Sequence, residues 1–215
     1  PMKRTLNSSP TLTYELPIQT FNMQEERPIY IILEGPDRCG KDTQQELIIK
    51  NMPDHVFHKM HYSALPFKDP EKHITHSSQL YDQLLRSILA FSQQEISVIF
   101  NRSYLSESVY APLYRGYSGD YVFDIEKRYT TQLTDQLYLV TMVNDPNILM
   151  SRDDGKSQHG SLEDIQAEID GFVRAHHKSS IKNKLLINVK DMSPNEVSTM
   201  IVQFLHERRP EYSKQ

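Results

Sequence analysis

The sequence predicts an α/β domain built around a parallel sheet. Short apolar runs, typical of buried strands, alternate along the chain with longer segments of helical periodicity. The first apolar run leads directly into Gly35, Gly40 and Lys41, a spacing typical of a loop that binds phosphate at the start of a helix. In such sheets the carboxyl ends of the strands carry the functional residues.

The composition is that of an ordinary soluble globular protein. Of the 215 residues, 38% are hydrophobic and 24% are charged, and the formal net charge is −4. This balance argues against a protein that holds nucleic acid by bulk charge. Cys39 is the one cysteine, which fits a reducing, cytoplasmic location, and no apolar run is long enough to span a membrane. We expect a polar extension over residues 1–27 and one domain over residues 28–215.

The first half of the domain begins with a strand at residues 28–35, an apolar run that ends at the glycine loop. Residues 42–52 have helical spacing, with Leu47 and Ile48 on an apolar stripe. Residues 55–63 are typical of a second strand. A longer amphipathic helix is predicted over residues 77–94, because its leucines and isoleucine recur on one side.

The second half continues the alternation. Strands are predicted at 96–103, 135–143 and 184–189, and helices at 162–177 and 194–208. Residues 151–161 form a polar, glycine-containing stretch that suits a short lid. Ser161 and Asp164 have the spacing of a capping box at the start of the helix that follows.

The glycine loop predicts a phosphate site. Gly35 and Gly40 permit a tight backbone path in which successive N–H groups face one anion. Lys41 can reach the β- and γ-phosphates, and the following helix adds the partial positive charge of its N-terminus. Cys39 within the loop is interpreted as a small filler whose backbone belongs to the cradle.

Several segments resemble the thymidylate kinases, in the order of that family. "EGPDRCGKDTQ" (34–44) resembles their phosphate loop, and "NRSYLSESVYAPLYRG" (101–116) resembles their Asp-Arg-Tyr segment. "TDQLYLVTMVNDPNILMSR" (134–152) resembles the strand, Asp-Pro turn and arginine that open the lid, and "INVKDMSPNEV" (187–197) the last strand and adenine-side loop. The resemblance is looser to deoxynucleoside kinases, and some phage deoxynucleotide kinases share Gly-Lys-Asp-Thr.

The resemblance implies a kinase that uses ATP and Mg²⁺, with a five-stranded parallel sheet in the order 2-3-1-4-5 and a short lid. It implies that Lys41 holds the donor phosphates, that Thr43 contacts the α-phosphate and that Arg102 bridges acceptor and transferring group. Arg152 would approach ATP when the lid closes. The cofactor-binding set that it implies is Gly35, Arg38, Cys39, Gly40, Lys41, Asp42, Thr43 and Arg152.

The chain departs from the family pattern where metal is bound. Relatives usually have a hydroxyl after the lysine and an Asp before the arginine of the second motif, whereas this chain has Asp42 and Asn101. The carboxylate thus lies on the opposite side of the metal site from its position in the family, and the local charge is unchanged. We expect both residues to bind Mg²⁺ directly or through water. The alternative is that Asp42 caps the helix.

The acceptor side is less complete. The segment where thymidylate kinases carry an acceptor-phosphate arginine reads "HYSALPFKDP" (61–70) and has none; candidate substitutes are Lys68, Arg86, Arg115 and Arg128. A phosphate acceptor needs no general base, whereas a hydroxyl acceptor benefits from one. The candidates for that base are Asp37, which in the family contacts the deoxyribose, and Glu107, whose alternative is a solvated helix residue.

The aromatic-rich segment 103–123 suggests a binding site for a base, for which Tyr110 and Tyr114 are the chosen residues. The alternative for some of its tyrosines is ordinary core packing. We therefore expect an ATP-dependent kinase acting on a small deoxypyrimidine nucleotide. The alternatives are a phage kinase that phosphorylates hydroxymethyl-deoxyuridine in DNA, a deoxynucleoside kinase or a non-catalytic nucleotide-binding regulator. DNA as the substrate, a bacterial host cell as the location and a homodimer are left open.

Overall fold

The computed structural model describes residues 27–62, 68–92, 94–152 and 160–209. The expected extension over residues 1–27 lies outside this part of the chain, apart from Arg27. So does most of the expected lid, residues 153–159.

Five parallel strands form one sheet in the order β2-β3-β1-β4-β5, as expected. Apolar side chains fill β1, β3 and β4 because helices cover both faces of these central strands. The edge strand β2 is half exposed. The strands are β1 (Tyr30–Glu34), β2 (Val56–His61), β3 (Ile96–Asn101), β4 (Leu137–Val143) and β5 (Asn183–Asn188).

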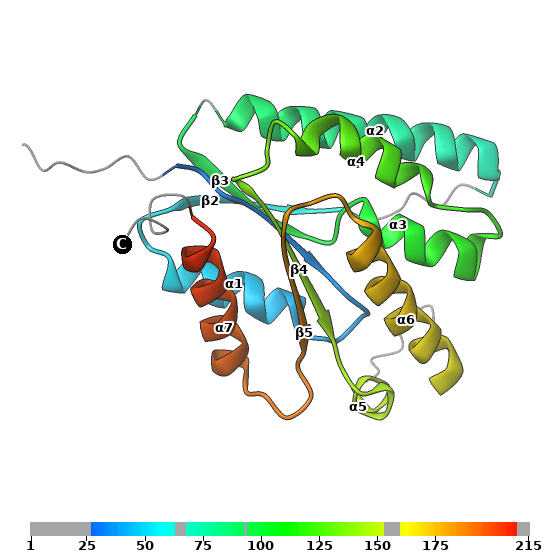
Figure 1. Ribbon diagram of the computed structural model, residues 1–215. Coiled ribbons are helices and arrows are strands. Elements are labelled where there is room, and N and C mark those ends of the chain that lie inside the picture. The colour runs from blue at the N-terminus through cyan, green and yellow to red at the C-terminus, as the bar shows by residue number, and fades with distance from the viewer. Residues whose placement is uncertain (1–26, 63–67, 93, 153–159, 210–215) are drawn as a thin grey trace, which may run out of the picture.

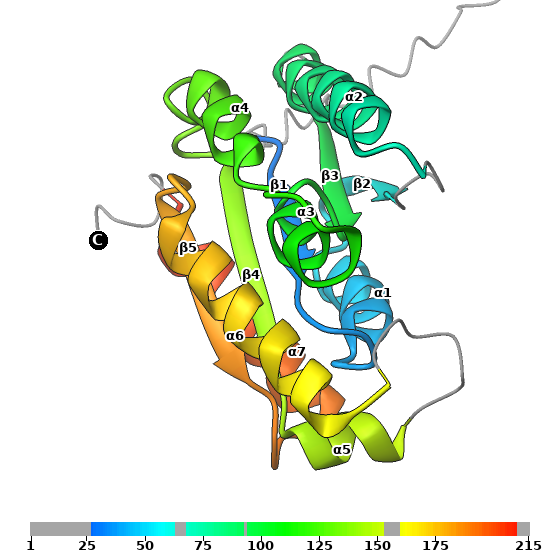
Figure 2. The same cartoon turned by 90° about the vertical axis from the view of Figure 1, so that its right-hand side faces the viewer.

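Helices cover the sheet on two faces. Helices α1 and α7 pack together on one face, and α2 packs on α4 across the other (Figure 1). Helix α6 lies along α3 and reaches down to α5, near the carboxyl ends of the strands (Figure 2). The helices are α1 (Lys41–Asn51), α2 (Pro70–Phe91), α3 (Leu105–Tyr110), the π-helix η1 (Ala111–Arg115), α4 (Tyr121–Thr130), α5 (Pro146–Ser151), α6 (Leu162–Lys178) and α7 (Pro194–Glu207).

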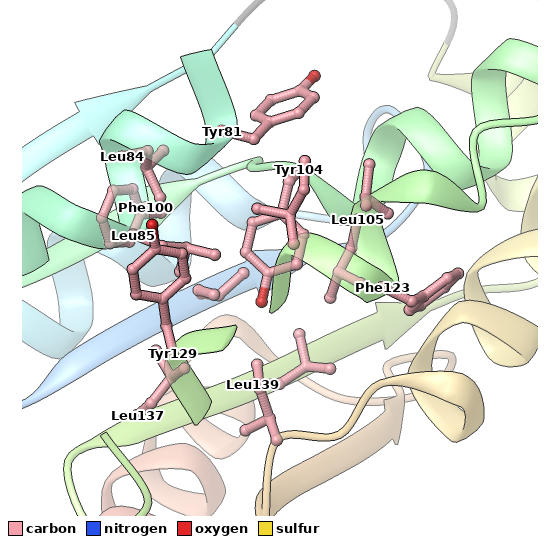
Figure 3. Packing of buried hydrophobic residues seen from close by; sticks show 14 of the residues in the cluster. Tyr81, Leu84, Leu85, Phe100, Tyr104, Leu105, Phe123, Tyr129, Leu137 and Leu139 are labelled. Atoms are coloured by element: carbon pink, nitrogen blue, oxygen red, sulfur yellow. The ribbon is translucent and has the colours of Figure 1, made fainter. Parts of the chain in front are cut away.

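Alternate residues of the strands divide the core into two clusters. On the α2 side, Tyr104 is fully buried among side chains from β3, β4 and the helices α2 and α4 (Figure 3). On the α1 side, Ile31, Leu33 and Ile99 pack against α1 and α7. The two clusters hold the strand ends rigidly, so residues that follow β1 and β3 have fixed positions.

The helix prediction was wrong in three places, of which the first is α5 (residues 146–151), where only an Asp-Pro turn was expected. Helix α2 begins at Pro70 and not at residue 77, because Asp69 caps it by accepting a hydrogen bond from the Glu71 N–H at 3.0 Å and Pro70 suits a first helical position. Residues 105–130, in which no helix was predicted, contain α3, η1 and α4. The capping box of Ser161 and Asp164 is confirmed.

Candidate active site

The glycine loop joins β1 to α1. Gly35 has φ 142° and Gly40 has φ 96°, conformations that favour glycine. A Cβ on Gly35 would lie 2.1 Å from the carbonyl oxygen of Met142 in β4, so the backbone passes too close to its neighbour for any side chain. Helix α1 begins directly after Gly40, and its first N–H groups therefore face the loop.

Lys41 is folded back onto this loop. Its ammonium donates to the carbonyl oxygens of Gly35 at 2.9 Å and Pro36 at 2.6 Å. The side chain is buried, and that burial lowers the pKa of the ammonium. The loop thus holds a desolvated cation within reach of any anion that it binds.

Arg102 follows β3 and is held from two sides. It has a positive φ of 68°, and its N–H donates to the carbonyl of Leu33 at 3.0 Å. The guanidinium binds the carboxylate of Asp37 in the glycine loop and donates to the Tyr110 hydroxyl at 3.0 Å. A strained backbone kept by so many contacts is typical of a functional position.

Glu34, the last residue of β1, fixes the turn that carries Arg102. Its carboxylate accepts from the Ser103 N–H at 2.9 Å, the Ser103 hydroxyl at 3.0 Å and the Ser106 hydroxyl at 2.6 Å. Burial raises the pKa of Glu34, and the hydrogen bonds from Ser106 and Ser103 oppose that rise. The sequence analysis assigned Glu34 no role, because the serines it binds are about 70 residues away.

Asp42 and Asn101 face each other across the mouth of the site. The Asn101 amide nitrogen donates to one carboxylate oxygen of Asp42. Asp42 does not occupy the N-cap of α1, because that position is Gly40 and the Asp42 carboxylate turns to Asn101, but it lies in the first turn of the helix, where an acidic residue is favourable. The second carboxylate oxygen and the amide oxygen remain available to a cation.

Two arginines connect the glycine loop to α5. The Arg38 guanidinium donates to the carbonyl of Leu149 in α5 at 3.1 Å, and the Arg152 guanidinium donates to the carbonyl of Arg38 at 3.3 Å. Arg152 is exposed at the end of α5, where the expected lid begins. The glycine loop and the C-terminal end of α5 are therefore in direct contact.

These groups line one cleft of about 380 Å³. It brings together most of the residues predicted for the donor phosphates, the metal and the phosphate bridge, but within the described ranges Gly35 and the buried Cys39 do not line it. His61, at the end of β2, also lines it; the sequence analysis missed it, although its place at a strand's carboxyl end was a usable signal. The lining residues are Asp37, Arg38, Gly40, Lys41, Asp42, Thr43, His61, Asn101, Arg102 and Arg152.

Glu107 has a different environment from the one expected. It is 2% exposed, so the solvated-residue alternative is wrong. Its carboxylate binds the guanidinium of Arg115 and accepts from the hydroxyls of Tyr117 at 2.6 Å and Tyr121 at 3.1 Å. Within the described ranges it is absent from the cleft lining, and its partners favour a role in holding α3, η1 and α4 together.

Of the two chosen tyrosines, Tyr110 lies beside Arg102, and among the described residues neither lines the cleft. Tyr110 is buried and stacks on Tyr114, with ring centroids 6.0 Å apart and an interplanar angle of 26°. The Tyr114 hydroxyl donates to Glu168 of α6 at 2.6 Å. Arg102, Tyr110, Tyr114 and Glu168 therefore connect the cleft to the helix that follows the expected lid.

The suggested cationic substitutes lie elsewhere. Arg86 and Arg128 both bind Asp82 between α2 and α4, at 2.8 and 3.1 Å. Arg115 is paired with Glu107, and Lys68 is exposed ahead of α2. Among the described residues, none of the four lines the cleft.

Comparison with known proteins finds the same fold in solved structures, among them two kinases. The YorR protein of Bacillus subtilis, in complex with phosphorylated GDP, is similar over 82% of this chain and 95% of its own, with 21% identity and a TM-score of 0.58. Thymidylate kinase from Candida albicans is similar over 84% and 92%, with 15% identity and a TM-score of 0.52. A gluconokinase from Sinorhizobium meliloti 1021 is similar over 88% of this chain and 99% of its own, with 13% identity and a TM-score of 0.51.

No family model and no curated protein matches the sequence. The structural similarities show the class of fold: a five-stranded parallel sheet flanked by helices, which this chain shares with solved structures that include a thymidylate kinase and a gluconokinase. Within the described ranges, no helix is long and apolar enough to cross a membrane.

The residues present fit a nucleotide with a divalent cation. The glycine loop passes so close to the Met142 carbonyl that a Cβ is excluded at Gly35, and the Lys41 ammonium donates to the loop backbone. Asp42, Asn101 and Thr43 line the cleft and offer oxygen ligands. His, Cys, Asp and Glu form no group of three that could hold a metal ion within residues 27–62, 68–92, 94–152 and 160–209, so a cation here would also need phosphate oxygens.

Proposed function

We propose that this protein is an ATP-dependent kinase that transfers the γ-phosphate to a deoxypyrimidine nucleotide. One observation carries the proposal: a single cleft brings Lys41 of the glycine loop together with Arg102 after β3 and Arg152 at the base of the lid. A protein that merely bound nucleotide would need the loop but would not need two further arginines at it.

The residues of the cleft divide the work between donor and acceptor. Lys41 and the N–H groups at the start of α1 bind the donor phosphates and stabilise the charge that develops during transfer. Arg102, held by Asp37 and Tyr110, lies where it can bind both the acceptor and the transferring group. Arg152 adds charge when the lid closes. Bound Mg²⁺, held by Asp42 and Asn101, would neutralise phosphate charge.

The favoured acceptor atom is a phosphate oxygen. A phosphate is already an anionic nucleophile and needs no general base. Both candidate bases are engaged, because Asp37 binds Arg102 and the buried Glu107 binds Arg115. The proposed contacts for a planar base are Tyr110, which lies beside the Arg102 guanidinium, and Tyr114, which stacks on Tyr110.

A transfer screen with [γ-³²P]ATP tests the acceptor. It includes thymidine, deoxynucleoside monophosphates, gluconate and hydroxymethylated DNA, and also guanine nucleotides because the YorR structure contains phosphorylated GDP. We expect label on a deoxypyrimidine monophosphate. Label on hydroxymethylated DNA alone would replace this acceptor with the polymer, and label on thymidine alone would indicate a hydroxyl acceptor.

A further inference from the structure

The register of β2 places His61 beside the expected cation site. His61 pairs with Asn101 of β3, so their Cα atoms are about 4.8 Å apart and their side chains point to the same face of the sheet. That face is the α1 side, because Phe57, four residues earlier and on the same face of the strand, packs in the α1 cluster, and because Asn101 reaches Asp42.

The contact one step earlier in β2 defines the geometry further. Lys59, two residues before His61, binds Glu46 of α1 at 2.9 Å. Moving from Glu46 to Asp42 is one helical turn, about 5.4 Å, toward the carboxyl edge of the sheet. Moving from Lys59 to His61 is a similar step, about 6.6 Å, in the same direction. His61 therefore lies opposite Asp42, and both line the cleft.

We propose that His61 is a third protein ligand of the nucleotide's divalent cation, together with Asp42 and Asn101, and that it makes the site bind Mn²⁺ more tightly than Mg²⁺. The proposal rests on the proposed function in that the cation is the one that accompanies ATP. His61 and Asp42 are exposed, and with Asn101 they supply one imidazole nitrogen, one carboxylate and one amide oxygen.

The chemistry of these ligands determines whether the site binds Mn²⁺ or Mg²⁺ more tightly. Mg²⁺ requires oxygen ligands in near-ideal octahedral geometry and gives up water reluctantly. Imidazole is a better ligand for first-row transition ions, whose selection depends on ligand type. A site with an imidazole beside a carboxylate therefore favours Mn²⁺, with the phosphates of the nucleotide completing the coordination.

Pulsed EPR of Mn²⁺ with a non-hydrolysable ATP analogue tests the proposal directly. We expect ¹⁴N modulation from a coordinated imidazole in the unchanged protein and its loss in His61→Gln. The matched control is His58→Gln, an exposed histidine of the same strand that points to the opposite face, where its ring lies 6.4 Å from that of Phe91. That variant should keep the signal.

Affinity gives a second readout. His61→Gln should weaken Mn²⁺ binding to the protein–analogue complex by at least about tenfold and change Mg²⁺ binding less. Absence of ¹⁴N modulation in the unchanged protein, or its persistence in His61→Gln, would overturn the proposal. Transfer assays with Mg²⁺ are scored separately, so that an imidazole signal without transfer would contradict the kinase function and leave the ligand assignment standing.

Discussion

At the scale of single residues, charge at Asp42 is the feature that sets this site apart from the family pattern. The Asp42→Asn variant keeps the size of the side chain and removes its charge. We expect the Mg²⁺ concentration for half-maximal transfer to rise roughly tenfold, while binding of metal-free ATP changes little. Asp69→Asn is the control, because Asp69 caps α2 outside the cleft and asparagine caps equally well. An unchanged Mg²⁺ titration for Asp42→Asn would assign Asp42 to the helix alone.

Asp37 is the second residue whose role can be separated by kinetics. Its carboxylate holds Arg102, so Asp37→Asn loosens a group that binds the acceptor. With a phosphate acceptor, we expect the KM for the acceptor to rise roughly tenfold, about 1.4 kcal/mol, and kcat to fall less. A fall in kcat of about 10²–10⁴-fold at unchanged KM would instead identify Asp37 as a general base.

The residues that could be foreseen are those in short, continuous motifs. The spacing of Gly35, Gly40 and Lys41 was sufficient to place the phosphate loop. The meeting of Asp42 with Asn101 followed from the family resemblance. Glu34 and His61 were missed because their partners come from other strands and helices, and a sequence does not show which face a side chain takes until the register is known.

At the scale of elements, the close passage of the glycine loop past β4 is the strictest constraint. Gly35→Ala places a Cβ 2.1 Å from the Met142 carbonyl at a positive φ. We expect a loss of roughly 2–5 kcal/mol in the free energy of unfolding, measured by urea denaturation. Gly116→Ala is the control, since its φ is +73° but no atom lies within 4 Å of the added Cβ, and about 1 kcal/mol is expected. Equal losses would contradict the steric account.

The accuracy of the element prediction follows the strength of the periodic signal. The buried strands were predicted within a few residues because continuous apolar runs are required where helices cover both faces. Helix α4 was missed although Val122, Phe123, Ile125 and Tyr129 form a buried stripe along it. Helices α3 and η1 were missed because they are only 6 and 5 residues long and are rich in tyrosine and polar residues. Those residues are instead used in pairs such as Tyr104 with Glu126 and Tyr121 with Glu107.

At the scale of the whole molecule, a buried histidine couples stability to pH. His176 of α6 contacts the Thr141 hydroxyl at 3.0 Å, and its pKa is lowered to about 4, first by burial and then by Lys184 and His177. The unfolded chain binds a proton near pH 6.5 that the folded chain does not bind until about pH 4. Stability from this group is therefore present above pH 6.5 and is lost as the pH falls toward 4.

We expect His176→Asn to flatten the pH dependence of the free energy of unfolding between pH 6.5 and 4, as measured by urea denaturation at several pH values. His58→Asn, at an exposed position of β2, should leave that slope unchanged. The same slope in the unchanged protein and in His176→Asn would show that other groups cause the acid sensitivity.

The central claim is that the cleft transfers phosphate, and Lys41 tests it most directly. The measurement is the rate of ³²P transfer from [γ-³²P]ATP to a deoxypyrimidine monophosphate by the unchanged protein and by Lys41→Ala, with circular dichroism as the check on folding. We expect transfer by the unchanged protein and its loss in a folded Lys41→Ala variant, because the Lys41 ammonium stabilises phosphate charge most strongly in the transition state. Comparable rates for the two proteins would contradict the assignment of the reaction to this cleft.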